Sequence, residues 1–170
     1  KLEDIDHENI LDKKNEITEK SGEIFHLLEE LSKFKLNKNT NFATLIHPNT
    51  YISNHAKINI GSIICCDVNV NINTYIGKFC ILNSKTSIDH DNYISDFVGT
   101  GPGAKTGGQV KINNFSFIGI NSSIKNNIKV DTNTVVGGNS FLNKNSKKNS
   151  TYIGVPAKIK KKRRIGEKYL

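Results

Sequence analysis

Aliphatic residues recur at every sixth position through the middle of the chain, from residue 46 to residue 142. Fifteen of the 17 positions in this series hold Ile, Leu or Val, and the two exceptions are Thr100 and Thr106. The series consists of Ile46, Ile52, Ile58, Ile64, Val70, Ile76, Leu82, Ile88, Ile94, Thr100, Thr106, Ile112, Ile118, Ile124, Val130, Val136 and Leu142. A period of six matches neither an α-helix, with about 3.6 residues per turn, nor the alternation of a half-buried strand.

A second series, of mostly small residues, lies four positions after each aliphatic residue, as at Thr74, Cys80 and Ser116. The residue directly after each aliphatic one is usually Gly, Asn, Asp or Ser, which tolerate positive φ and form tight corners. Short strands joined by corners, each with one large and one small side chain pointing inward, explain both series. Three such strands make an 18-residue triangular coil, and stacked coils form a parallel β-solenoid. The series has room for a little over five coils.

The chain divides into three parts around this solenoid. Residues 1–40 are charged, residues 41–145 form the predicted β-helix domain, and residues 146–170 contain a final strand, a turn and a basic tail. In the first part the spacing predicts a helix over residues 22–35, with Ser21 as its cap. Its apolar residues are Ile24, Leu27, Leu28, Leu31 and Phe34. We expect this helix to cover the open strand edge at one end of the solenoid.

Composition narrows the possible classes of protein. The 170 residues include 24 Lys and Arg against 16 Asp and Glu, a net charge of +8, and 36% are hydrophobic. That fraction is low for a globule, but a narrow triangular core needs no more. No run of about 18 apolar residues occurs, which excludes a transmembrane helix, and the acidic start is not a secretory signal. The sequence has no Met, so we expect a trimmed N-terminus.

The three cysteines, Cys65, Cys66 and Cys80, are too few and odd in number for a disulfide framework. No histidine cluster at zinc-binding spacing accompanies them, so we expect no metal site. Reduced thiols are typical of a cytoplasmic protein. The basic residues are not interleaved with aromatic ones as in nucleic-acid-binding proteins, so nucleic acid is not the expected partner.

Four segments carry a resemblance to a known family. They are residues 42–48 (FATLIHP), residues 81–83 (ILN) with 88–91 (IDHD), residues 118–122 (IGINS) and residues 154–158 (GVPAK). They resemble hexapeptide-repeat acyltransferases, and within these the bacterial sialic acid O-acetyltransferases and nucleotide-aminosugar N-acetyltransferases of polysaccharide biosynthesis. The resemblance spans residues 41–160 and implies a left-handed solenoid, although the general crossover rule favours the right hand.

His90 is the expected general base for acetyl transfer, since an imidazole can take the acceptor's proton near neutral pH. Either Asp89 or Asp91 is close enough in sequence to orient it, and Asp91 reaches it only if the chain turns a corner there. The resemblance implies that corner, with Asp91 raising the basicity of His90, and it places Asn83 near the base across a subunit boundary. The alternative for His90 is a solvated corner residue without a catalytic role.

The period predicts a second part of this site. Gly108 follows His90 by three hexads, which is one whole coil, so the two should stack at the same corner. Gly107 and Gly108 have no side chain to obstruct a ligand, so a backbone N–H there can face the thioester oxygen, the role that the resemblance assigns to this glycine. We attribute the polar exceptions Thr100 and Thr106, which bracket this coil, to the active site. The alternative is a glycine-rich bulge.

The resemblance also implies an acetyl-CoA site. It places Ile120 and Gly138, which are one whole coil apart, along the groove that leads from the active site. It places the turn over residues 154–158, with Lys158, near the adenine. The basic residues 158–164 either attract the phosphates of the coenzyme or form a solvated tail. One position departs from the family, because Gly99 stands where many relatives have a second histidine.

Together these observations predict an enzyme that transfers an acetyl group from acetyl-CoA to a hydroxyl or amino group of a sugar or sugar nucleotide. The resemblance implies a homotrimer with sites between subunits. Two alternatives stay open: transfer to a non-sugar acceptor, and a non-catalytic β-helix used for assembly. Relatives have an acceptor-binding subdomain before the solenoid, and residues 1–40 lack its strand–glycine-loop–helix pattern. We therefore expect that subdomain to be truncated or absent.

Overall fold

The computed structural model describes residues 42–168, and the predicted helix over residues 22–35 lies outside them. The described residues form strands and corners and no helix, so they include none that is long and apolar enough to cross a membrane. The strands are β1 (Leu45–Ile46), β2 (Tyr51–Ile52), β3 (Lys57–Ile58), β4 (Ile63–Ile64), β5 (Asn69–Val70), β6 (Tyr75–Ile76), β7 (Ile81–Leu82), β8 (Ser87–Ile88), β9 (Tyr93–Ile94), β10 (Gly99–Thr100), β11 (Lys105–Thr106), β12 (Lys111–Ile112), β13 (Phe117–Ile118), β14 (Ser123–Ile124), β15 (Lys129–Val130), β16 (Thr134–Val136), β17 (Phe141–Leu142), β18 (Ser150–Gly154) and β19 (Ala157–Lys162).

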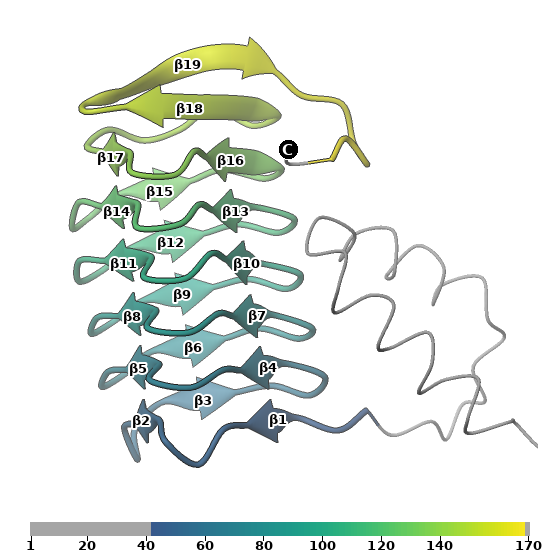
Figure 1. Cartoon of the computed structure of the whole chain (residues 1–170), viewed down its shortest axis with the longest axis vertical. Coiled ribbons are helices and arrows are strands. Elements are labelled where there is room, and N and C mark those ends of the chain that lie inside the picture. The colour runs from purple at the N-terminus through teal and green to yellow at the C-terminus, as the bar shows by residue number, and fades with distance from the viewer. Residues whose placement is uncertain (1–41, 169–170) are drawn as a thin grey trace, which may run out of the picture. The chain divides into compact units, whose positions relative to one another are not determined.

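The strands form three sheets, one on each face of a triangular prism (Figure 1). The first sheet has the order β1-β4-β7-β10-β13-β16-β18-β19, the second β17-β14-β11-β8-β5-β2 and the third β15-β12-β9-β6-β3. Within the solenoid, neighbouring strands are parallel and stack in register, as Ile64 does on Leu82. One hexad therefore forms one strand and one corner, and three hexads form one coil. The predicted parallel β-solenoid is confirmed.

The corners line up along three edges of the prism, named here by one residue of each. The Asn83 edge joins the first sheet to the second, the His90 edge joins the second to the third, and the Phe97 edge joins the third to the first. A position returns to the same edge only after a whole coil, so corners of consecutive hexads lie on different edges. This assignment decides which predicted site residues are neighbours.

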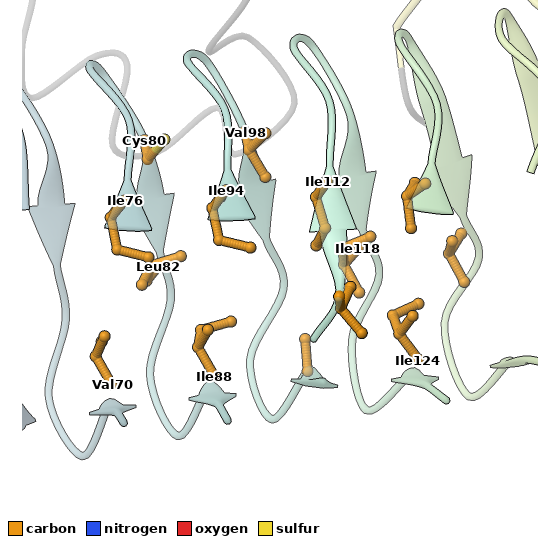
Figure 2. Packing of buried hydrophobic residues seen from close by; sticks show 14 of the residues in the cluster. Val70, Ile76, Cys80, Leu82, Ile88, Ile94, Val98, Ile112, Ile118 and Ile124 are labelled. Carbon is orange, nitrogen blue, oxygen red and sulfur yellow. The ribbon is translucent and has the colours of Figure 1, made fainter. Parts of the chain in front are cut away.

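The aliphatic series fills the interior of the prism (Figure 2), apart from Ile46 in the first coil, which is 47% exposed. Ile76, Leu82 and Ile94 are 0% exposed and Ile88 is 1% exposed, and their side chains point inward from successive strands. The small-residue series is buried beside them and includes Cys80, whose thiol pKa is raised to about 12 by burial. Both predicted series therefore face the core, and Cys80 is a packing residue.

The corners turn at a different residue from the predicted one. The sequence predicts positive φ directly after each aliphatic residue, at positions such as Asn71 and Gly77. The structure places it two residues later, at positions such as Asn73 and Phe79. The residue directly after the aliphatic one instead continues the backbone ladder, as Asn71 does by donating its N–H to the Ile88 carbonyl at 2.9 Å.

Three of the positive-φ residues are phenylalanines on the Phe97 edge. Phe79, Phe97 and Phe115 have φ values of 54°, 59° and 59°. Their rings stack with centroids 5.4 Å and 5.1 Å apart. Bulky residues seldom adopt this backbone conformation, and stacking between successive coils offsets its cost.

The solenoid ends in an antiparallel hairpin. β18 extends the first sheet by pairing with β16, and β19 runs back along β18. The predicted final strand and turn are therefore two paired strands. Residues 160–162, predicted as part of a basic tail, belong to β19.

We expect Ile94→Ala to destabilise the solenoid by about 2–5 kcal/mol, because it removes a buried side chain and leaves a cavity in a narrow core. Lys125→Ala, at an exposed corner residue, should change the free energy of unfolding by less than about 0.5 kcal/mol. Chemical denaturation followed by circular dichroism measures both variants. Equal losses in the two would contradict the assignment of the aliphatic series to the core.

Candidate active site

His90 lies in the corner after β8, where the chain turns at Asp91. Asp91 has a φ of 56°, a left-handed conformation that aspartate tolerates. The turn brings its carboxylate beside the imidazole, with 2.7 Å between His90 Nδ1 and Asp91 Oδ2. The two side chains are 49% and 42% exposed, so a ligand can reach them. In a flat strand they would point to opposite faces, so the corner is what creates the pair.

The structure also distinguishes the two carboxylates next to His90. Asp89 accepts the backbone N–H of His90 at 2.8 Å and the Asn71 side-chain amide at 3.2 Å, so it caps the corner. Asp91 is hydrogen-bonded to the imidazole and accepts the Asn73 side-chain amide at 3.1 Å. Asp91 is therefore the residue that orients His90.

Hydrogen bonding sets the charges of this pair. The bonds from His90 and Asn73 lower the pKa of the Asp91 carboxyl, and the bond to Asp91 raises the pKa of His90. An ionised Asp91 holds a proton on Nδ1 of His90, which leaves Nε2 of the neutral ring as an acceptor. His90 thus has the tautomer that a general base needs.

Gly108 lies against the imidazole, one coil further along the His90 edge. A Cβ atom at Gly108 would be 2.5 Å from both Cε1 and Nε2 of His90, so only a glycine leaves room for the ring. The preceding Gly107 uses its N–H for the ladder and donates to the Ile124 carbonyl at 2.8 Å. The N–H of Gly108 donates to no residue in the range 42–168. A backbone donor is therefore available beside Nε2.

Two asparagines that were not predicted from the sequence help to build this corner. Asn73 lies one coil before Asp91 and binds its carboxylate. The buried Asn92 joins two coils, because its Nδ2 donates to the carbonyl oxygens of Asp89 at 2.6 Å and Gly107 at 3.0 Å. Counting back one coil from Asp91 could have found Asn73. Asn92 stands in the small-residue series, and nothing in the sequence signals its bonds.

The other predicted site residues lie away from the His90 edge. Asn83 follows β7, Ile120 follows β13 and Gly138 follows β16, so all three are on the Asn83 edge. Gly138 stacks on Ile120, because a Cβ atom at Gly138 would be 2.8 Å from Ile120 Cγ2. Lys158 is in β19, in the terminal hairpin. Within one chain the structure does not bring these residues to His90.

Gly99 lies on β10, on the outer face of the first sheet. A Cβ atom there would be 2.9 Å from Cδ2 of Phe117, its partner on the neighbouring strand β13. The Phe117 ring therefore takes the space that a larger residue at position 99 would need. A larger residue at position 99, such as the histidine expected from the resemblance, would need this ring to move.

The cysteines add no second reactive centre. Cys65 and Cys66 are half-buried free thiols, and burial raises the pKa of Cys65. Cys66 Sγ lies 3.2 Å from Ser84 Oγ. No group of three or more His, Cys, Asp or Glu side chains within residues 42–168 is placed to hold a metal ion.

The known proteins that this chain resembles include sugar-nucleotide acetyltransferases. Over 82 residues it is 39% identical to a GDP-perosamine N-acetyltransferase of Escherichia coli O157:H7, a match that covers 48% of this chain and 37% of that protein. A histidine-to-alanine mutant of GDP-perosamine N-acetyltransferase from Caulobacter crescentus, solved with CoA and GDP-perosamine, gives a TM-score of 0.76 at 24% identity, covering 80% of this chain and 65% of that one. The acetyltransferase domain of PglB from Neisseria gonorrhoeae, solved with acetyl coenzyme A, gives a TM-score of 0.69 at 26% identity. This match covers 71% of this chain and 59% of that one.

No protein-family model matches the chain, and the chain spans less than half the length of the curated relative that it matches. The structural likeness confirms the predicted fold, a left-handed parallel β-helix. The identities of these proteins confirm the resemblance to sugar acetyltransferases that the motifs predict.

We expect Asp91→Asn to lower the pKa of His90 toward the ordinary value for histidine, because an amide cannot stabilise the imidazolium as a carboxylate does. An NMR titration of the ring protons measures this pKa, and His90→Gln identifies the resonance. The control is Asp67→Asn, another exposed corner aspartate with positive φ, on the Asn83 edge. An unchanged His90 pKa in Asp91→Asn would mean that the pair does not form in solution.

Proposed function

We propose that this chain contains the catalytic β-helix of an acetyltransferase, which moves an acetyl group from acetyl-CoA to the amino group of a nucleotide-linked amino sugar. The observation that carries the proposal is the His90–Asp91 pair against Gly108, which combines a base and a backbone donor on one edge. The likeness to the GDP-perosamine N-acetyltransferase of Escherichia coli supports N-acetylation of a GDP-linked sugar over O-acetylation.

Each group at this edge has a step in the proposed reaction. Nε2 of His90 takes a proton from the acceptor amine while the amine nitrogen attacks the thioester carbonyl. The N–H of Gly108 donates to the carbonyl oxygen as negative charge develops there, and Asp91 stabilises the imidazolium. The C–S bond then breaks, the acetyl group stays on nitrogen, and His90 returns its proton to the CoA thiolate. Because neutral His90 is the reactive form, the rate should fall as the pH drops through its raised pKa.

We further propose a homotrimer with sites between subunits. The base is on one edge of the prism, and Asn83 and Gly138 are on another, so a single chain separates His90 from the residues expected to contact acetyl-CoA. A neighbouring chain that brought its Asn83 edge to this His90 edge would complete the site.

The remaining parts of the chain fit the same proposal. The terminal hairpin, with Lys158, supplies positive charge for the coenzyme phosphates. Free thiols at all three cysteines support a cytoplasmic location.

His90→Ala should lower kcat by about 10²–10⁴-fold, the usual contribution of a general base. The release of CoA from acetyl-CoA measures this rate. The acceptors tested are nucleotide-linked 4-amino sugars, including a GDP-linked one, free and CMP-linked sialic acids, and serine. His55→Ala is the matched control, because His55 is an exposed histidine on the same edge in the first coil, and it should keep the wild-type rate.

Full turnover by His90→Ala would overturn the assignment of the base. Release with sialic acid alone would contradict N-acetylation, and release with serine alone would contradict a sugar acceptor. If no acceptor leads to CoA release and acetyl-CoA does not bind at millimolar concentration, the non-catalytic assembly alternative is favoured.

A shared site predicts complementation between two inactive variants. His90→Ala removes the base, and Gly138→Trp obstructs the proposed acetyl-CoA groove on the other edge. Refolding the two together in equal amounts should restore about a quarter of the wild-type CoA release, because each site needs an intact edge from each of two neighbours. A mixture no more active than its components would place the whole site within one chain.

A further inference from the structure

The first N–H of each corner usually completes the backbone ladder between coils. In twelve corners it donates to the carbonyl oxygen of the aliphatic-series residue in the next coil, at 2.7 to 3.0 Å. Asn71 and Gly107, on the His90 edge, follow this rule by donating to the carbonyls of Ile88 and Ile124. In such a corner, the backbone of the next coil fixes the position of the corner along the axis of the solenoid.

The corners that begin at Asn83 and Asp89 depart from this rule. The Asn83 N–H donates to the hydroxyl of Thr100 at 3.1 Å, and the Asp89 N–H donates to the hydroxyl of Thr106 at 3.2 Å. Neither N–H donates to the backbone carbonyl of the same threonine. At the Thr106 corner β8 and β11 accordingly pair at one position, whereas β7 and β10, like β5 and β8, still pair at two. These two corners hold the three side chains predicted for catalysis, which are Asn83, His90 and Asp91.

The two hydroxyls belong to the residues that interrupt the aliphatic series. Thr100 and Thr106 are 3% and 8% exposed, so each brings a polar group into a core that is apolar elsewhere in the series. A buried hydroxyl is unfavourable unless it is hydrogen-bonded. The corner N–H supplies such a bond to each threonine, and the Thr100 hydroxyl has a second one, with the Thr86 hydroxyl at 2.8 Å. One other described corner uses a hydroxyl in this way: Asp131, at the end of the solenoid, donates to Ser146.

We propose that Thr106 and Thr100 are positioning residues, which hold the His90 and Asn83 corners on side-chain acceptors instead of the regular backbone ladder. The side-chain hydroxyl of a residue and its backbone carbonyl oxygen are in different positions. A corner that is hydrogen-bonded to the hydroxyl therefore lies in a different place from a corner bonded to the carbonyl. For Thr106 the result is the placement of the His90 ring against Gly108. The consequence for catalysis rests on the proposed function, and the consequence for geometry rests on the hydrogen bonds alone.

Thr106→Val tests this proposal, because it removes the hydroxyl and keeps the shape of the side chain. We expect the Asp89 N–H to return to the backbone carbonyl of residue 106 and His90 to move relative to Gly108. In the proposed reaction kcat should fall about tenfold, with little change in the KM for acetyl-CoA. Thr106→Ser, which keeps the hydroxyl, should restore most of the rate.

Two NMR measurements need no acetyl transfer. The amide resonance of Asp89 and the ring resonances and pKa of His90 should change in Thr106→Val and return in Thr106→Ser. The pKa of His90 responds to the carboxylates of Asp89 and Asp91, so a moved corner alters it. Thr134→Val is the control: it removes a fully buried, hydrogen-bonded threonine hydroxyl on another strand and should leave His90 unchanged.

Wild-type resonances and wild-type kcat in Thr106→Val would overturn the proposal. So would equal losses in Thr106→Ser and Thr106→Val, which would assign residue 106 to packing alone. If no acceptor is acetylated but the resonances move as expected, the geometric inference is supported and the proposed function fails separately.

Discussion

The backbone ladder between coils is the constraint on which the rest of this structure depends. Each strand of the solenoid bonds to the equivalent strands of the neighbouring coils, so each position is repeated one coil further along the prism. The ladder allows the core to be narrow, because one large and one small side chain per strand fill it. It also means that two residues a coil apart are neighbours, whatever their identity. The placement of Gly108 against His90 follows from this repetition.

The proposed catalytic groups lie in the corners because the corners are the part of each hexad whose side chains the ladder and the core do not use. Strand N–H and C=O groups are used between coils, and inward side chains are used in the core. Corner residues two and three places after the aliphatic position keep exposed side chains, as His90 and Asp91 do. Some corner N–H groups have no partner among residues 42–168, and that of Gly108 is one of them. A base and an oxyanion donor can therefore be placed on one edge without breaking the fold.

Much of this could be predicted from the sequence, because the period converts sequence distance into spatial distance. The solenoid, the inward series and the stacking of His90 on Gly108 all follow from counting. The residues alone left the choice between Asp89 and Asp91 open, since it depends on which corner residue has positive φ, and only the resemblance predicted Asp91. Periodicity places the turn in the corner but does not identify its residue. The hydrogen bonds of Asn92 could not be predicted from the sequence either, because a buried side chain in the small-residue series can be apolar or polar without changing the period.

Thr100 and Thr106 illustrate how a departure from a repeat becomes informative once its partners are known. In the sequence they show that a core position is polar, which predicts a nearby active site but does not identify the bond involved. In the structure both hydroxyls accept corner N–H groups, whereas in twelve other corners the equivalent N–H bonds to a carbonyl oxygen. The regular ladder gives corners of one edge the same bonding pattern, which suits stability but cannot adjust a single corner. Exchanging a carbonyl acceptor for a hydroxyl changes that pattern at one corner and leaves the coils on either side intact. In a repeat protein, where stability is distributed over similar coils, such a local exchange is an economical way to place a catalytic side chain.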